Sequence, residues 1–154
     1  MAVPLPRPRT PPGAGCARPG AWGLAGGATS LLDVEVIGDA LPELRVREAV
    51  AYAAASAGIA EGHVAVSFVD AERIAELNAE HRGIEGPTDV LSFPVDEDGP
   101  VAGERELGDV VICPAHTEDL LEAVVHGVLH LTGMDHERDE GEMLALQHEL
   151  RSWL

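Results

Sequence analysis

The stretch VVHGVLHLTGMDH, from Val124 to His136, contains three histidines in the spacing H-x3-H-x5-H. His126 and His130 are four residues apart, so in a helix they lie on one face, one turn above the other. Gly133 stands where that helix is expected to end, because glycine adopts a positive φ at little cost and lets the chain reverse. The turn then returns His136 toward the other two. The stretch therefore predicts a helix and a turn that bring three imidazoles together.

Three neutral imidazoles, with nitrogen ligands at about 2.0–2.1 Å, suit Zn²⁺ and leave a fourth position open for chemistry. We therefore predict one zinc ion per chain, held by His126, His130 and His136, in a catalytic rather than a structural site. Asp135 either orients a ligand ring or caps the turn. Glu122 precedes the first histidine by one helical turn; we favour a solvated helix carboxylate over an outer base there.

The residue after the first histidine is informative about the reaction. Zinc peptidases of the long zincin type have a glutamate there, which takes a proton from the metal-bound water. This chain has Gly127, and no other carboxylate lies between His126 and His130. Peptide hydrolysis by that route is therefore disfavoured. A metal ion without this base still neutralises charge on a substrate oxygen, and an anionic substrate such as a phosphodiester gains most from that.

The composition limits what the chain can bind. Its formal net charge is −17, and all ten basic residues are arginine. Such a surface repels nucleic acid on average, so a polyanionic substrate needs a local positive site such as a metal ion or an arginine. No apolar run reaches the roughly 18–20 residues of a membrane span. The two cysteines indicate no disulfide framework, which favours a soluble cytosolic protein with Cys113 buried in the core.

Residues 1–30 differ from the rest of the chain. They are rich in proline and glycine and show no alternating apolar pattern. Such a segment cannot bury enough apolar surface to fold. We expect a disordered tail, or residues upstream of the true start, followed by a single domain over residues 31–154.

Alternating and helical patterns divide the remaining chain into eight elements. Strands are expected at LLDVEVI (31–37), HVAVSFV (63–69), TDVLSFP (88–94) and LGDVVICP (107–114). Helices are expected over 42–57, over 71–81 with Asp70 as cap, over the first two histidines, and over 139–153. Thr117 is expected to cap the histidine helix, with Glu118 and Asp119 in its first turn. The order βαβαββαα predicts an α/β or α+β domain with helices packed against a sheet.

Three separated stretches, LNAEHRGIEGPTDVLSFP, LGDVVICP and HGVLHLTGMDH, resemble the YbeY family of bacterial metal-dependent endoribonucleases. The resemblance covers residues 31–154. It implies an α+β fold with a four-stranded mixed β-sheet packed with helices, and a zinc ion on the three motif histidines. It also implies a role for the arginine of the first motif, here Arg82. A guanidinium binds phosphate oxygens and stabilises charge that grows in phosphoryl transfer, although a surface salt bridge is the simpler role.

The chain departs from the family pattern in three places. His81 stands where the family usually has a tyrosine, and IEGPTD (84–89) replaces a more polar segment. Eleven residues separate Pro114 from His126, where family members have a longer helical stretch; this bears on which RNA is accepted. Asp89 and Ser92 are candidates for the same cleft, with a turn or strand-end cap as the alternative for Asp89. Asp109 is expected to be a buried, structural acceptor beside the site.

The resemblance implies a cytosolic zinc-dependent endoribonuclease specific for single-stranded RNA. It would act in ribosomal RNA maturation, including the 3′ end of 16S RNA, and in ribosome quality control. The small ribosomal subunit is the expected partner, and neither membrane nor DNA is expected. Arg82 would stabilise negative charge, and the proton acceptor is a hydroxide on the metal, Asp135 or a substrate 2′-hydroxyl. The alternatives are a zinc peptidase, and a ribosome-associated factor in which zinc only holds the fold.

Overall fold

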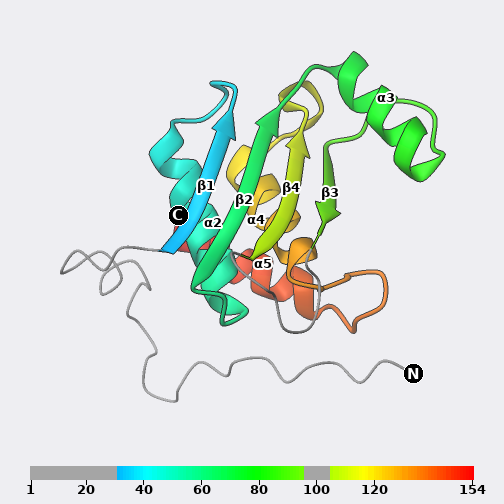
Figure 1. Cartoon of the computed structure of the whole chain (residues 1–154). Coiled ribbons are helices and arrows are strands. Elements are labelled where there is room, and N and C mark those ends of the chain that lie inside the picture. The colour runs from blue at the N-terminus through cyan, green and yellow to red at the C-terminus, as the bar shows by residue number, and fades with distance from the viewer. Residues whose placement is uncertain (1–30, 96–104) are drawn as a thin grey trace.

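The computed structural model of the chain describes residues 31–95 and 105–154, which form a four-stranded sheet and its covering helices (Figure 1). The elements are β1 (Leu31–Ile37), α2 (Glu43–Ser56), β2 (Glu61–Phe68), α3 (Ala71–Arg82), β3 (Val90–Pro94), β4 (Glu106–Ile112), the 3₁₀ turn η1 (Pro114–His116), α4 (Leu120–Leu131) and α5 (Glu142–Ser152). Apart from η1, their types and order are those predicted. The expected disordered tail or upstream start (1–30) lies outside the described residues, as do residues 96–104 between β3 and β4.

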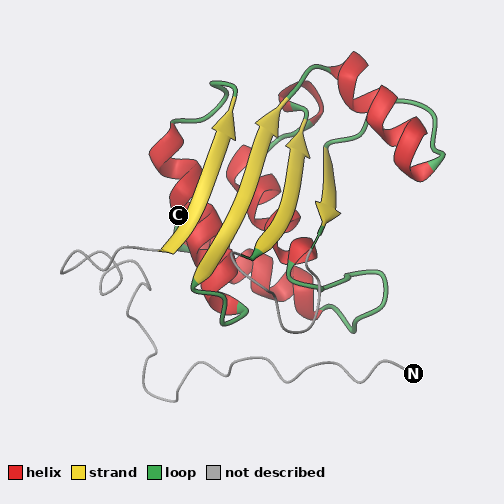
Figure 2. Cartoon of the chain, viewed as in Figure 1, coloured by secondary structure: helices red, strands yellow, loops and turns green. Residues whose placement is uncertain are grey.

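The sheet has the strand order β1-β2-β4-β3. β1, β2 and β4 run parallel, and β3 is antiparallel to β4 at the edge (Figure 2). Two parallel strands need a crossover, which α2 supplies between β1 and β2 and which α3 and β3 supply between β2 and β4. The α+β fold with a four-stranded mixed sheet is thereby confirmed.

α2 and α4 cover one face of the sheet, and α5 packs against both of them (Figure 1). The few aromatic residues leave this core to valine, leucine, isoleucine and alanine. Its fully buried members include Val46, Val50, Val64, Val66, Val110, Ile112, Val124 and Val128. Cys113, at the end of β4, is also fully buried, as predicted. No helix among the described residues is both long and apolar enough to cross a membrane.

α4 approaches the sheet closely at Gly127. A Cβ atom built on this residue would lie 2.4 Å from Cγ1 and 3.0 Å from Cγ2 of Val110 on β4. The carbonyl oxygen of Gly127 also accepts a hydrogen bond of 3.0 Å from the Ser92 hydroxyl on β3. A side chain at position 127 therefore has no room, because it would enter the interface between helix and sheet.

The boundaries of α4 and α5 differ from those expected. Asp119, not Thr117, caps α4: its Oδ1 accepts from the Glu122 amide at 3.1 Å. The prediction was wrong because the 3₁₀ turn η1 precedes the helix, and the Thr117 hydroxyl closes that turn by donating to the Cys113 carbonyl at 2.7 Å. Asp139 likewise precedes α5, accepting from the Met143 amide at 2.8 Å.

The other oxygen of Asp119 links the two helices. Arg151 on α5 donates through Nε to Asp119 Oδ2 at 2.7 Å. Burial alone would raise the pKa of Asp119, but the hydrogen bonds from Arg151 and the Glu122 amide lower it below its usual range. One carboxylate thus caps α4 and ties α5 to its first turn.

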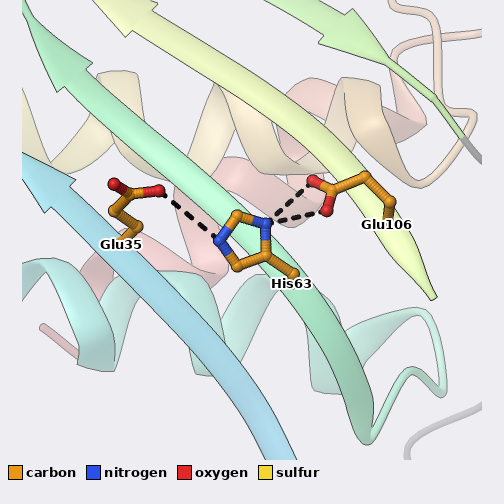
Figure 3. Close-up of polar contacts among 3 residues, drawn as sticks. All are labelled: Glu35, His63 and Glu106. Carbon is orange, nitrogen blue, oxygen red and sulfur yellow. Dashed lines mark hydrogen bonds and ion pairs between the residues drawn. The ribbon is translucent and has the colours of Figure 1, made fainter. Parts of the chain in front are cut away.

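α3 packs on the opposite face of the sheet, against Leu91, Val111 and Cys113. Beyond α3 this face carries charged side chains. His63 Nδ1 lies 2.8 Å from Glu106 Oε2, and His63 Nε2 lies 3.6 Å from Glu35 Oε2 (Figure 3). Asp109 has an exposed side chain on the same face, and partial desolvation of its carboxyl group, with the nearby Glu106 carboxylate, raises its pKa. The expectation that Asp109 is a buried acceptor beside the histidine site is therefore wrong.

Gly127→Ala is expected to destabilise the protein by about 1–3 kcal/mol, because the added methyl group overpacks against Val110. Alanine has a better helix propensity than glycine, but this gain of up to about 1 kcal/mol offsets only part of the overpacking cost. Urea unfolding of metal-stripped protein measures it. In a Val110→Ala background the same change should cost much less, and equal costs in the two backgrounds would contradict the contact.

The pKa of His63 is expected to lie above 6.5, chiefly because of its hydrogen bond to Glu106; burial opposes this, and the charges of Glu106, Asp33 and Glu35 add to it. A raised pKa contributes stability that is complete below pH 6.5 and is lost as pH rises through the folded-state pKa. NMR titration of the imidazole tests this. Glu106→Gln should lower the pKa more than Glu35→Gln, and the reverse order would refute the assignment.

Candidate metal centre

The three histidines of the opening stretch meet at the C-terminal end of α4. His126 and His130 come from the helix, and a turn through Gly133, with φ +96°, brings His136 alongside. One ring nitrogen from each histidine lies within 4.8 Å of those from the other two. The Nε2 atoms of His126 and His130 are 3.1 Å apart. Tetrahedral zinc ligands at 2.0–2.1 Å have nitrogens about 3.3 Å apart, so this separation suits a shared ion.

Two of the imidazoles are oriented by partners on their outer side. His126 Nδ1 lies 2.7 Å from Oε1 of Gln147, a residue of α5 that is only 9% exposed. An amide oxygen only accepts, so Nδ1 carries the proton and the Nε2 lone pair faces the other histidines. His130 has a hydrogen bond with the Met134 backbone. Both rings therefore present a free nitrogen to the centre.

The protonation of His130 also suits metal binding. Burial, with the neighbouring His126 and His136, lowers its pKa below the usual 6.5. The ring is therefore neutral at neutral pH, as a metal ligand must be. His136 Nδ1 is buried and has no hydrogen-bond partner among the described residues. A cation between the rings would be held by nitrogens from all three histidines, so the residues fit the predicted ion.

Asp135 acts as a turn residue in this structure. Its Oδ1 accepts from the Glu137 amide at 3.0 Å, and its Oδ2 lies 3.4 Å from Arg138 Nε. Of the two roles expected for this carboxylate, these contacts match the cap. A role for Asp135 in proton transfer stays a prediction.

A cleft of about 450 Å³ adjoins the centre on the side of His126. Its lining comes from the start of β3, the η1 turn, α4 and α5: Asp89, Val90, His116, Thr117, Glu118, Asp119, Glu122, Ala123, His126 and Gln147. Asp89, a predicted cleft residue, also closes its own turn by accepting from the Val90 amide at 2.8 Å. Ser92 does not line this cleft, since its hydroxyl is bonded to Gly127. Glu122 is exposed, as favoured from the sequence.

Arg82, the predicted charge-stabilising residue, is the last residue of α3 and does not line this cleft. It is exposed and makes no hydrogen bond or ion pair with any residue that the structure describes. The alternative of a surface salt bridge is therefore not seen among these residues. His81, beside it, packs its ring against Phe93 with centroids 4.9 Å apart.

Gln147 is the site residue that sequence reasoning missed. It follows Met143 and precedes Leu150 on the buried stripe of α5. A lone amide on an otherwise apolar stripe is a signal, because a buried polar side chain requires a partner. The pattern alone did not reveal that this partner would be His126, which lies 21 positions earlier.

The fold and the site together define an α+β protein with a three-histidine centre of the kind that binds a metal ion. The family described as endoribonuclease YbeY matches residues 36–153. The chain belongs to this family, and so to a class of metal-dependent hydrolases that act on RNA phosphodiester bonds. The resemblance and the enzyme class predicted from the sequence are thereby confirmed.

Several relatives support this assignment. A protein of Persephonella marina named endoribonuclease YbeY is 38% identical over 120 residues, covering 68% of this chain and 78% of the relative. Namesakes from Corynebacterium efficiens and Bifidobacterium longum are 40% and 41% identical over 58% of this chain; it spans only 56% and 59% of their lengths. The solution structure of TM1509 from Thermotoga maritima is 30% identical, with a TM-score of 0.52, covering 78% of this chain and 87% of that one.

Zn²⁺ is expected to raise the melting temperature of chelator-stripped protein at pH 7, because the ion binds the folded state; an excess of 100 times Kd stabilises by about 2.7 kcal/mol. The rise should shrink as pH falls, because protons compete with the ion for the ligand nitrogens. The lowered pKa of His130 also means that the metal-free protein loses stability as pH falls below 6.5.

His130→Ala should abolish the zinc-dependent rise. His148→Ala, a change at an exposed histidine of α5 outside the cluster, serves as the matched control and should keep it. A rise that persists in His130→Ala would show that the ion binds elsewhere.

Proposed function

We propose that residues 31–154 form a zinc-dependent endoribonuclease that cuts single-stranded RNA in the cytoplasm. Its substrate would be ribosomal RNA, including the 3′ end of 16S RNA, in maturation and ribosome quality control at the small ribosomal subunit. The observation that carries the proposal is the convergence of His126, His130 and His136 in a chain of the endoribonuclease YbeY family.

In this mechanism the three imidazoles hold the ion, and Gln147 keeps His126 in the tautomer that binds it. Zinc, when bound, supplies Lewis-acid stabilisation of negative charge on a phosphate oxygen. Three neutral ligands leave the ion's full charge in place, which offsets the repulsion expected from a chain of formal net charge −17. Several carboxylates line the neighbouring cleft, so the ion would supply the attraction for a phosphate that approaches from that side.

Arg82 is proposed to supply the second positive charge. Its guanidinium makes no ion pair with a described residue, so none of these residues competes with a phosphate there. Asp135 remains one candidate proton acceptor, beside the substrate 2′-hydroxyl; its contacts to the Glu137 amide and Arg138 would have to loosen for that task. An unpaired strand suits this layout, because its backbone can bend between separate charged groups.

The peptidase alternative loses support from the packing of α4. The position that carries the catalytic glutamate in zinc peptidases is Gly127, whose missing side chain would collide with Val110. The alternative of a ribosome-associated factor makes a different prediction. If zinc only held the fold, His136→Ala would unfold the protein, whereas a catalytic site gives a folded, inactive variant.

Arg82→Glu is expected to lower cleavage of a labelled single-stranded RNA by the zinc-loaded protein by about 10²–10³-fold, the usual effect of removing a group that stabilises transition-state charge. Arg82→Lys should recover part of the activity, because lysine keeps the positive charge but cannot bind two phosphate oxygens at once as a guanidinium does.

The matched control is Arg73→Glu, on the same helix, where the native arginine pairs with Glu76 at 3.1 Å. It should cleave nearly as well as the wild type. Casein serves as the peptidase substrate and should stay intact. Equal losses in Arg73→Glu and Arg82→Glu would remove the specific role of Arg82, and a wild type that cuts casein but not RNA would overturn the proposed function.

A further inference from the structure

Gln147 stands at the junction of the metal centre and the cleft. Its Oε1 lies 2.7 Å from His126 Nδ1, and the residue also lines the 450 Å³ cleft. It belongs to α5, whereas the histidines belong to α4 and its following turn. A change at residue 147 can therefore alter the centre without removing a ligand.

Of the two polar groups of the Gln147 amide, only the oxygen makes a hydrogen bond within the part of the protein that the structure describes. Oε1 accepts from His126, and the Nε2 group makes no hydrogen bond to any described residue. The residue is 9% exposed, but Nε2 is not among the buried side-chain atoms that lack a partner, so this donor can be reached from the cleft. The free donor belongs to a residue that faces a cleft otherwise rich in carboxylates, among them Asp89, Glu118 and Glu122.

The choice of an amide has an electrostatic consequence. A carboxylate at this position would accept the same hydrogen bond, but it would pull the proton from the imidazole and make His126 a more basic ligand. A neutral amide holds the ring without adding negative charge beside the ion. It also keeps a donor, which a carboxylate lacks.

We propose that Gln147 is a positioning residue with two ends. Its oxygen fixes the tautomer and direction of His126 for the metal, and its NH₂ group donates to an oxygen of the RNA strand in the adjoining cleft. The second half rests on the proposed function, and the first half rests on the metal centre alone.

Three variants of the full chain separate the two ends. Gln147→Leu removes both, Gln147→Glu keeps the acceptor but replaces the donor with a charge, and His148→Gln is the matched control on the exposed side of α5. The measurements are Zn²⁺ affinity against a competing chelator, the visible spectrum of the Co²⁺-substituted protein, and the Kd for a single-stranded oligonucleotide. Circular dichroism and urea unfolding check that each variant folds.

Gln147→Leu should lower Zn²⁺ affinity about 10–100-fold and alter the Co²⁺ spectrum. Gln147→Glu should restore the affinity to the wild-type level or above, yet weaken oligonucleotide binding about tenfold or more. His148→Gln should change none of the three. If Gln147→Glu restores the Zn²⁺ affinity that Gln147→Leu loses, residue 147 orients His126 through a hydrogen bond and does not only fill space.

The claim that Gln147 positions His126 would be overturned if Gln147→Leu kept the metal affinity and Co²⁺ spectrum of the wild type. It would also be overturned if Gln147→Glu failed to restore them. Unchanged oligonucleotide binding in Gln147→Glu would overturn the donor half. If the wild type itself binds no oligonucleotide, the proposed function and the donor half both fail, while the metal readings still decide the positioning half.

Discussion

The contact between Gly127 and Val110 sets the position of the rest of the site. A methyl group at residue 127 would lie 2.4 Å from a Val110 methyl, so α4 approaches β4 at a distance that only glycine permits. Successive residues of a helix are rotated by about 100°. With Gly127 turned to the sheet, His126 and His130 face the neighbouring side, toward α5 and the returning turn. The same contact leaves no room for the glutamate of a zinc peptidase.

The centre depends on a second layer that comes from other elements. Asp119 caps α4 and holds Arg151, which ties α5 to the start of α4. α5 then places Gln147 behind His126. The amide of Gln147, held by this packing, fixes the orientation of the His126 ring. The positive φ of Gly133 reverses the chain and so places His136. The rigidity of the ligand set thus comes from helix packing rather than from the motif alone.

The order and types of the elements could be predicted because their periodicities are distinct, and the histidine cluster could be predicted because its spacing is local. Interactions across the chain could not. Thr117 and Asp119 are both good caps, and only the intervening 3₁₀ turn decides between them. The place of Gln147 on the buried stripe of α5 signals that it needs a partner, but His126 is revealed as that partner only when α5 is seen against α4. Asp109 could have been placed correctly, since strict alternation puts it on the opposite face from Val110.

The acidic charge and the RNA-cleaving family are compatible if positive potential is concentrated in a few groups. The ion and Arg82 would supply that potential, and the open sheet face with its carboxylates would not bind RNA. X-ray absorption at the zinc edge tests the central claim most directly. The account predicts three imidazole nitrogens at about 2.0–2.1 Å from zinc, an oxygen ligand in the remaining position and no sulfur. A shell made only of oxygen, or one that contains the Cys113 thiolate, would contradict it.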